Sequence, residues 1–161
     1  MLSVRDSFIL ITALFVSIYL STRIYFYKNI DNYRETDVMR HTMGGILIVF
    51  GFLKIVNLRG FVKIFSKYDI FSRHFEPWGY VYPFLEIYLG ILLLKGDNLS
   101  RVYKVIIAIM SISIVSVLES MRRGVQLRCG CIGSIFHIPL SYVTLSENIV
   151  MIIMSTYLLK A

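Results

Sequence analysis

The two cysteines of this chain are separated by a single residue, in the tripeptide Cys129-Gly130-Cys131. Two thiols at this spacing can form a disulfide with each other, exchange with the disulfide of a partner protein, or bind a soft metal ion such as Cu(I). Gly130 gives the backbone the freedom that a tight turn between the sulfurs needs. A disulfide in so small a ring has strained geometry, and strained disulfides are reduced more readily. The tripeptide therefore indicates a reactive dithiol.

Basic residues surround the thiols in the sequence. Arg128 directly precedes Cys129, and Arg122 and Arg123 lie a few residues earlier. Positive charge stabilises a thiolate relative to a thiol, which makes the cysteine more available as a nucleophile. We therefore favour thiol–disulfide exchange, with Cys129 and Cys131 as the reacting pair. A Cu(I) site and a pair of inert reduced thiols stay open as alternatives, and the histidines, which lie in separate segments, do not have the spacing of metal ligands.

The composition of the chain is typical of a membrane protein. Of its 161 residues 57% are hydrophobic, whereas soluble domains average about half or less. The net charge is +7, but the basic residues fall between apolar runs, which favours the flanks of membrane spans over a nucleic-acid surface. Backbone groups in lipid must pair within their own segment, and no alternating pattern of a barrel is present. The sequence therefore predicts an all-α, polytopic membrane helix bundle without nucleic acid as a partner.

Five apolar runs are long enough for a hydrocarbon core that takes about 20 helical residues. The first lacks the small-residue cleavage site of a signal peptide, so we expect it to be retained. Between the second and third runs, residues 57–76 place aromatic side chains at helical spacing among lysines and arginines, which predicts an amphipathic segment at the membrane interface. We expect the spans at about residues 7–27, 41–58, 77–94, 102–121 and 141–159.

The orientation of the bundle depends on its first span, because the basic residues divide equally between the two sides. The flank before this span carries Arg5, which Asp6 offsets, whereas Arg23 and Lys28 follow it. The positive-inside rule then favours an N-terminus and a Cys-Gly-Cys loop outside the cytoplasm. Dithiols that cycle through disulfides also work mostly outside the reducing cytosol. We therefore expect the dithiol to face the extracytoplasmic side.

The five-span arrangement places several ionisable residues in the same leaflet as the dithiol. Lys54 lies near the end of the second span and Glu86 about two turns into the third. Because these spans are antiparallel neighbours, we expect Lys54 and Glu86 to meet, as an ion pair that fixes helix packing or as a proton relay. Glu119 closes the fourth span, either as a surface partner of nearby arginines or as part of the site. Glu147 and Asn148 open the fifth span, where an acidic group also suits a helix N-terminus.

Four stretches of the chain resemble, in order, the motifs of the MauE/DoxX-like membrane proteins. The first carries the lysine, the second has a Pro-x-x-Glu pattern, the third has Cys-Gly-Cys with Ile132 in place of the usual Phe, and the fourth begins the last span. The resemblance covers about residues 42–159 and implies a four-helix membrane domain over 39–161. Residues 1–38 then form an additional N-terminal span and loop. The stretches are residues 44–68, 80–94, 122–133 and 139–148.

The resemblance implies a redox-associated integral protein of the bacterial inner (cytoplasmic) membrane. The protein that gives the family its name supports maturation of methylamine dehydrogenase, a periplasmic enzyme with many disulfides. Carried over, Cys129 and Cys131 would be the redox pair, and the partner an extracytoplasmic thioredoxin-like or disulfide-containing protein. A non-catalytic assembly subunit for a partner redox enzyme is the alternative, so activity as a thiol–disulfide oxidoreductase stays open. The chain lacks a second cysteine pair, so onward electron transfer would need a partner protein or a quinone.

Overall fold

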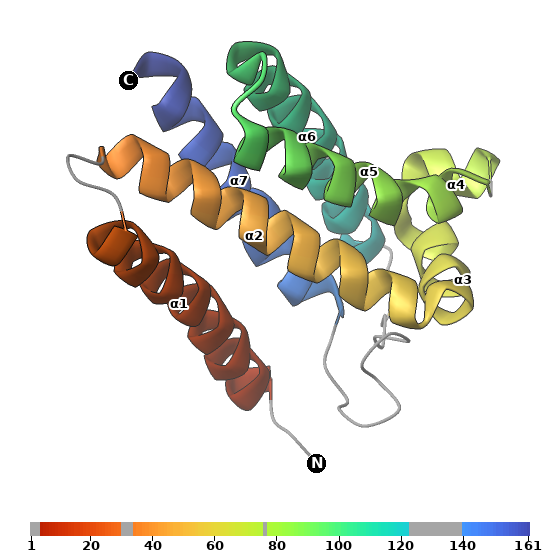
Figure 1. Cartoon of the computed structure of the whole chain (residues 1–161). Helices are drawn as coiled ribbons and strands as arrows, with labels where there is room; N and C mark the ends of the chain where they lie inside the picture. Colours follow the sequence, from red (N-terminus) through yellow and green to blue (C-terminus); the bar gives the residue numbers. More distant parts are fainter. Residues whose placement is uncertain (1–3, 30–33, 76, 123–139) are drawn as a thin grey trace.

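The computed structural model describes residues 4–29, 34–75, 77–122 and 140–161. Within these ranges the chain is helical apart from short connections, and no strand is present, so the predicted all-α fold is confirmed. The order along the chain is shown in Figure 1. The helices are α1 (Val4–Asn29), α2 (Glu35–Val56), α3 (Leu58–Tyr68), α4 (Ile70–His74), α5 (Pro77–Lys95), α6 (Leu99–Arg122) and α7 (Leu140–Lys160).

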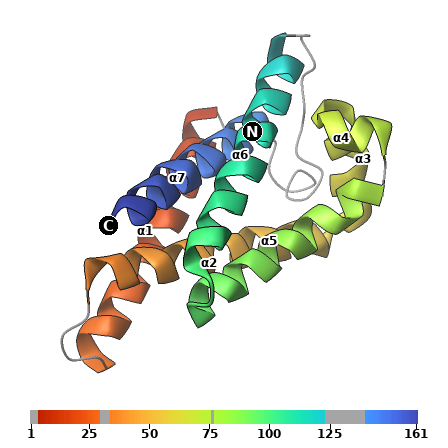
Figure 2. The ribbon, with the colours of Figure 1, turned by 90° about the horizontal axis from the view of Figure 1, so that it is seen from above.

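Two pairs of long helices make up the centre of the bundle. Helices α2 and α5 pack along each other, and α6 packs on α7. Helix α1 lies along α2, where the Phe26 and His41 rings meet at 4.7 Å between centroids. The short helices α3 and α4 project together at the end of the bundle where α2 ends and α5 begins (Figures 1 and 2). We call this the α3 end.

Three of the described helical segments are long and apolar enough to cross a membrane, which supports a multi-pass membrane protein. They are Glu35–Val56, Pro77–Lys95 and Leu99–Ser120. Large apolar side chains such as Phe52, Phe84 and Leu118 point out of these helices, as expected where a helix meets lipid. Crossing by α1 and α7 stays a prediction from the sequence, as does a separate unit over residues 1–38.

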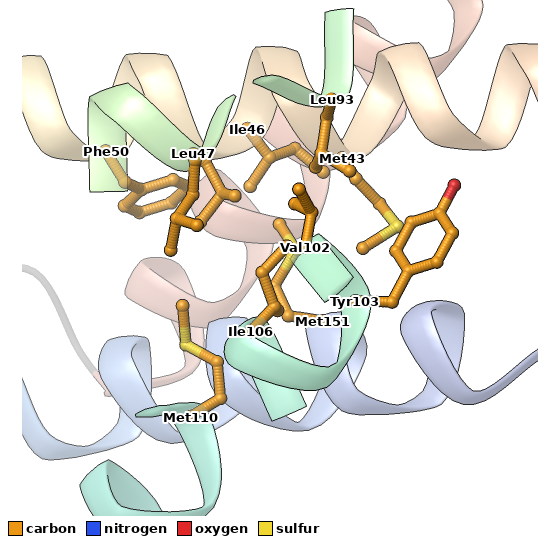
Figure 3. Packing of buried hydrophobic residues seen from close by; sticks show 11 residues of the cluster. Met43, Ile46, Leu47, Phe50, Leu93, Val102, Tyr103, Ile106, Met110 and Met151 are labelled. Atoms are coloured by element: carbon orange, nitrogen blue, oxygen red, sulfur yellow. The ribbon is translucent and has the colours of Figure 1, made fainter. Parts of the chain in front are cut away.

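The central core is built from aliphatic, methionine and aromatic side chains of α2, α5, α6 and α7. It lies between the two helix pairs, as Figure 3 shows. A second cluster joins α3 to the bundle, with Phe61 and Phe65 packed against Tyr82 and Val117. The labelled members of the central core are Met43, Ile46, Leu47, Phe50, Leu93, Val102, Tyr103, Ile106, Met110 and Met151.

Glycines let α2 and α5 approach until their backbones nearly touch. A Cβ atom at Gly90 would lie 2.8 Å from the carbonyl oxygen of Gly44, and one at Gly44 would lie 2.9 Å from that of Gly90. One turn before Lys54, a Cβ at Gly51 would lie 2.9 Å from the carbonyl oxygen of Pro83. Small residues at such crossings are the common means of close packing between membrane helices. This close approach is what brings the end of α2 beside the middle of α5.

We expect Gly90→Ala to destabilise the bundle by about 1–3 kcal/mol, because the added methyl group meets backbone that cannot move aside. Gly45→Ala is the matched control, since its Cβ would lie 3.2 Å from the flexible side chain of Ile18 on α1. The thermal midpoint of the detergent-solubilised protein measures both. Equal midpoints for the two variants would contradict the inference that α2 and α5 are in backbone contact.

The segment between α2 and α5 is amphipathic, as the sequence predicts, and it consists of the two helices α3 and α4. Helix α3 buries Phe61 and Phe65 and exposes its lysines. Asp69 then interrupts the helix with an extended backbone, and its side chain accepts a 2.7 Å hydrogen bond from the Ser72 amide at the start of α4. Aspartate is one of the preferred helix N-cap residues, so Asp69 itself is the local signal for this cap. The break turns α4 back against α3 and α5.

Candidate functional site

A lysine and two glutamates from three helices meet inside the bundle. The Lys54 Nζ atom, in the last turn of α2, donates to both carboxylate oxygens of Glu86 on α5, at 2.5 and 2.7 Å. The same atom lies 3.6 Å from Oε2 of Glu147, two turns into α7. The three side chains are only 8%, 2% and 1% exposed. We call Lys54, Glu86 and Glu147 the buried triad.

Aromatic rings close the triad off on the side of α3. Lys54 Nζ lies 5.3 Å from the centre of the Tyr82 ring and 6.0 Å from that of Phe61. The Tyr82 ring in turn packs on Phe65, with centroids 4.9 Å apart. Ring faces attract a cation, and the attraction is larger where water is excluded. The ammonium group is therefore held between two carboxylates and two rings.

A polar contact between α6 and α7 lies beside the triad. Asn148 Nδ2 donates to Ser113 Oγ at 2.8 Å, and both side chains are buried. The contact fixes the rotation of α7 about its axis, because Asn148 follows Glu147 directly in the helix. The Asn148–Ser113 contact therefore helps to orient the Glu147 side chain towards Lys54.

A further buried carboxyl group, Asp69, lies outside the three spans at the α3 end. Burial raises the pKa of Asp69, and hydrogen bonds from the Ser72 and Phe71 amides and from the Ser116 side chain oppose the rise. A cavity of about 180 Å³ adjoins this carboxyl group, with an almost wholly apolar lining. The sequence analysis did not identify Asp69, because it considered ionisable residues inside the spans and Asp69 lies in a segment rich in charged residues. The lining residues are Asp69, Phe71, Trp78, Tyr82, Ile109, Ile112 and Ser113.

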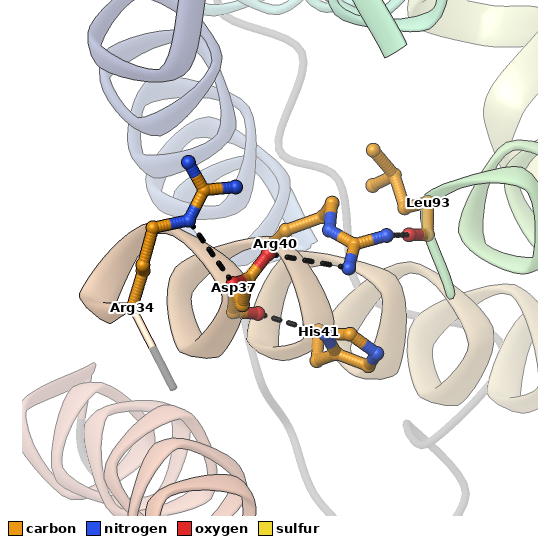
Figure 4. Close-up of polar contacts among 5 residues, drawn as sticks. All are labelled: Arg34, Asp37, Arg40, His41 and Leu93. Atoms are coloured by element: carbon orange, nitrogen blue, oxygen red, sulfur yellow. Dashed lines mark hydrogen bonds and ion pairs between the residues drawn. The ribbon is translucent and has the colours of Figure 1, made fainter. Parts of the chain in front are cut away.

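At the opposite end of the bundle a second set of charges holds α2 to α5 (Figure 4). Arg40 on α2 donates to the carbonyl oxygen of Leu93, near the end of α5, at 2.9 Å. Asp37 neutralises it, with ion pairs of 3.4 Å to Arg40 and 3.5 Å to Arg34, while its backbone carbonyl lies 2.8 Å from Nδ1 of His41. The last carbonyl groups of a helix lack partners within the helix, so Arg40 satisfies one of them. The packing of α2 against α5 therefore accounts for these charged residues.

The structure brings together some of the residues singled out in the sequence. Lys54 and Glu86 are in contact, as the antiparallel arrangement predicts, and Glu147, two turns into its helix, joins them. Asn148 pairs with α6, and Glu119 is half-buried near the end of that helix. The remaining predicted site residues lie outside the described residues. They are Arg128, Cys129, Gly130 and Cys131.

The two helices that flank the cysteine-bearing stretch of sequence meet at the α3 end. Val117, near the end of α6, belongs to the cluster of Phe61 and Phe65, and Leu145, in the second turn of α7, packs against the same cluster. Helix α6 ends at Arg122 and α7 begins at Leu140 (Figure 1). The end of α6, the start of α7 and the buried triad therefore share one end of the bundle.

Comparison with known proteins gives a family for most of the chain. The family described as methylamine utilisation protein MauE matches residues 35–161, which span α2 to α7. No curated protein and no solved structure matches the chain. The matched range leaves out α1 and contains the triad and both cysteines.

Proposed function

The chain belongs to the MauE family, and from this premise we propose that it is a membrane thiol–disulfide exchange protein whose reacting groups are Cys129 and Cys131. Its partner would be an extracytoplasmic thioredoxin-like or disulfide-containing protein, and its task the oxidation or maturation of that partner. The family description refers to methylamine utilisation, which makes a redox enzyme of that process one candidate partner. Residence in a bacterial inner membrane is part of the proposal.

One structural observation supports the proposal in addition to the sequence. The helix end at Arg122 and the helix start at Leu140 lie at the end of the bundle that also holds the buried triad. The stretch between them contains the two thiols of the chain. The cluster of ionisable groups therefore lies at the end of the bundle where the described chain stops before the cysteine-bearing stretch of sequence and resumes after it. At the opposite end, the charged residues Arg40 and Asp37 pair with each other, and Arg40 holds α2 to α5.

The exchange needs two displacement steps at sulfur. The thiolate of one cysteine attacks the partner's disulfide, so that a mixed disulfide forms and one partner sulfur leaves as a thiolate. The second cysteine then attacks the mixed disulfide, which releases the reduced partner and leaves a Cys129–Cys131 disulfide. Two electrons pass to the partner, and the two protons that the cysteines lose equal the two that the partner gains. The same steps in reverse oxidise the partner, after which a quinone or another disulfide protein must take the electrons from the cysteines.

A non-catalytic assembly subunit is the second candidate function, and the burial of the triad favours it. A lysine enclosed by two carboxylates and two rings ties α2, α5 and α7 together whether or not any thiol reacts. Such a bundle could serve as a membrane platform on which a partner enzyme matures. The two functions differ in whether the cysteines change oxidation state.

The redox state of the thiols tests the proposal. Membranes containing the protein are quenched in acid with and without prior reductant, alkylated, and analysed by mass. We expect the reduced protein to take up two alkyl groups and the protein from untreated membranes to include a fraction that takes up none, because its thiols are joined. Cys131→Ser is the control, since it can take up one group only and cannot form the internal bond. Thiols that stay reduced under every condition would contradict the proposal, and copper retention lost in Cys131→Ser would favour Cu(I) handling instead.

A further inference from the structure

The buried triad has an imbalance of formal charge. Its groups are one ammonium and two carboxylates, and each side chain is at least nine-tenths buried. With all three ionised, the site would hold one uncompensated negative charge in the interior of a membrane bundle. Such a charge costs several kcal/mol after relaxation of the surrounding protein. A single bound proton removes it and leaves the site neutral.

The geometry distinguishes the two carboxyl groups. Glu86 accepts both short hydrogen bonds from Lys54, so its negative charge is paired directly. Glu147 approaches the ammonium with Oε2 alone, at 3.6 Å, and its Oε1 atom has no hydrogen-bond partner in the part of the chain that the structure describes. A carboxylate with one bare oxygen in an apolar interior is the less stabilised of the two. We infer that the triad is a proton-binding site in which Glu147 carries one exchangeable proton beside the Lys54–Glu86 ion pair.

The other titratable and charged groups near the triad do not change the assignment of the proton to Glu147. Among the described residues, the charges that act on Glu147 are those of Lys54 and Glu86. From α5, Tyr82 adds a phenol beside Glu86, and between α3 and α4, Asp69 adds a carboxyl group that accepts a hydrogen bond from the Ser72 amide. On α6, Glu119 is half-buried. The basic side chains of α3 and α4 all point away from the core as exposed groups, namely Arg59, Lys63, Lys67, Arg73 and His74.

The ionisation of Glu147 is thereby coupled to the packing of α7. Neutral Glu147 lies against the pair without adding a net charge, which keeps α7 in contact with α2. Loss of the proton creates the unpaired charge and weakens that contact. The inference goes beyond the proposed exchange reaction and does not depend on it, because no cysteine takes part.

Infrared spectroscopy of the whole protein in lipid nanodiscs tests the inference, through the C=O stretching band of a protonated carboxyl group. At neutral pH we expect such a band, shifted in D2O because the proton exchanges, and abolished by Glu147→Gln. Glu86→Gln is expected to lose the band as well, because with Glu86 neutral an ionised Glu147 balances the charge of Lys54. The matched control is therefore Lys54→Met combined with Glu86→Gln, which removes both charges of the pair, so that Glu147 is expected to keep its proton and its band. Asp69→Asn removes the other buried carboxyl group from consideration, and the band should survive it. The band should also survive with both cysteines replaced by serine, which separates this inference from the proposed function.

Stability gives a second readout that does not depend on assigning a band. Glutamine has the size and neutrality of a protonated glutamate, so Glu147→Gln is expected to keep the thermal midpoint of the wild type at neutral pH. At alkaline pH the variant should be the more stable of the two, because the wild type then loses the proton and gains a buried charge. The absence of an acid band in the wild type, its persistence in Glu147→Gln, its loss in the double variant Lys54→Met with Glu86→Gln, or a Glu86→Gln variant as stable as Glu147→Gln would overturn the assignment.

Discussion

Replacing Lys54 by methionine is expected to destabilise the protein by about 3–5 kcal/mol, the usual result of removing one partner from a buried ion pair. Methionine keeps much of the length and apolar character of the side chain, so the change isolates the loss of the ammonium group. Glu86 would lose both of its short hydrogen bonds and Glu147 its nearest cation. The free energy of unfolding, measured by denaturant titration in mixed micelles, reports the effect.

A double-mutant cycle shows whether the effect comes from the pair. Lys54→Met combined with Glu86→Gln leaves no charge on either partner, and we expect it to recover a large part of the loss. Lys63→Met on the exposed face of α3 is the matched control and should change stability by about 0.5 kcal/mol or less. Additive effects of the two single changes would show that Lys54 and Glu86 do not stabilise each other. Exchanging the two residues tests the choice left open by the sequence: a charge-swapped protein that folds and functions would favour an ion pair over a proton relay.

Cys129→Ser and Cys131→Ser are each expected to reduce thiol–disulfide exchange to the background rate. In the proposed reaction the two sulfurs act as one unit, so either single change should cost about as much as both together. The readout is the rate at which the protein in nanodiscs cleaves a fluorogenic disulfide peptide. Ser134→Ala, in the same stretch of sequence, is the control and should keep the wild-type rate.

The same variants separate the two candidate functions. A single serine variant should accumulate a mixed disulfide with its partner, because the second displacement step lacks its nucleophile. A double serine variant that supports maturation of the partner as well as the wild type does would contradict exchange. That outcome would leave the assembly role.

Much of the fold could be predicted because the relevant signals are local. The length of an apolar run sets the length of a span, so the expected 77–94 and 102–121 correspond to α5 and α6 with small differences at their ends. Alternation in chain direction then places the end of α2 beside α5, which was enough to predict contact between Lys54 and Glu86. Asp69 shows the limit of this reasoning, because the spacing of apolar residues predicts an amphipathic segment but does not show that a capping residue divides it into two helices.

The sequence by itself determined the membrane class, the helices, the family resemblance and the Lys54–Glu86 pairing. The tertiary structure alone decided that Glu147 completes the triad and that Arg40 holds the far end of α5. The physical reason is rotation about the helix axis: α7 is apolar around most of its circumference, so its own sequence does not indicate which face is buried. Which face of α7 is buried depends on the neighbouring helices, through the Asn148–Ser113 contact and the packing of Leu145 at the α3 end.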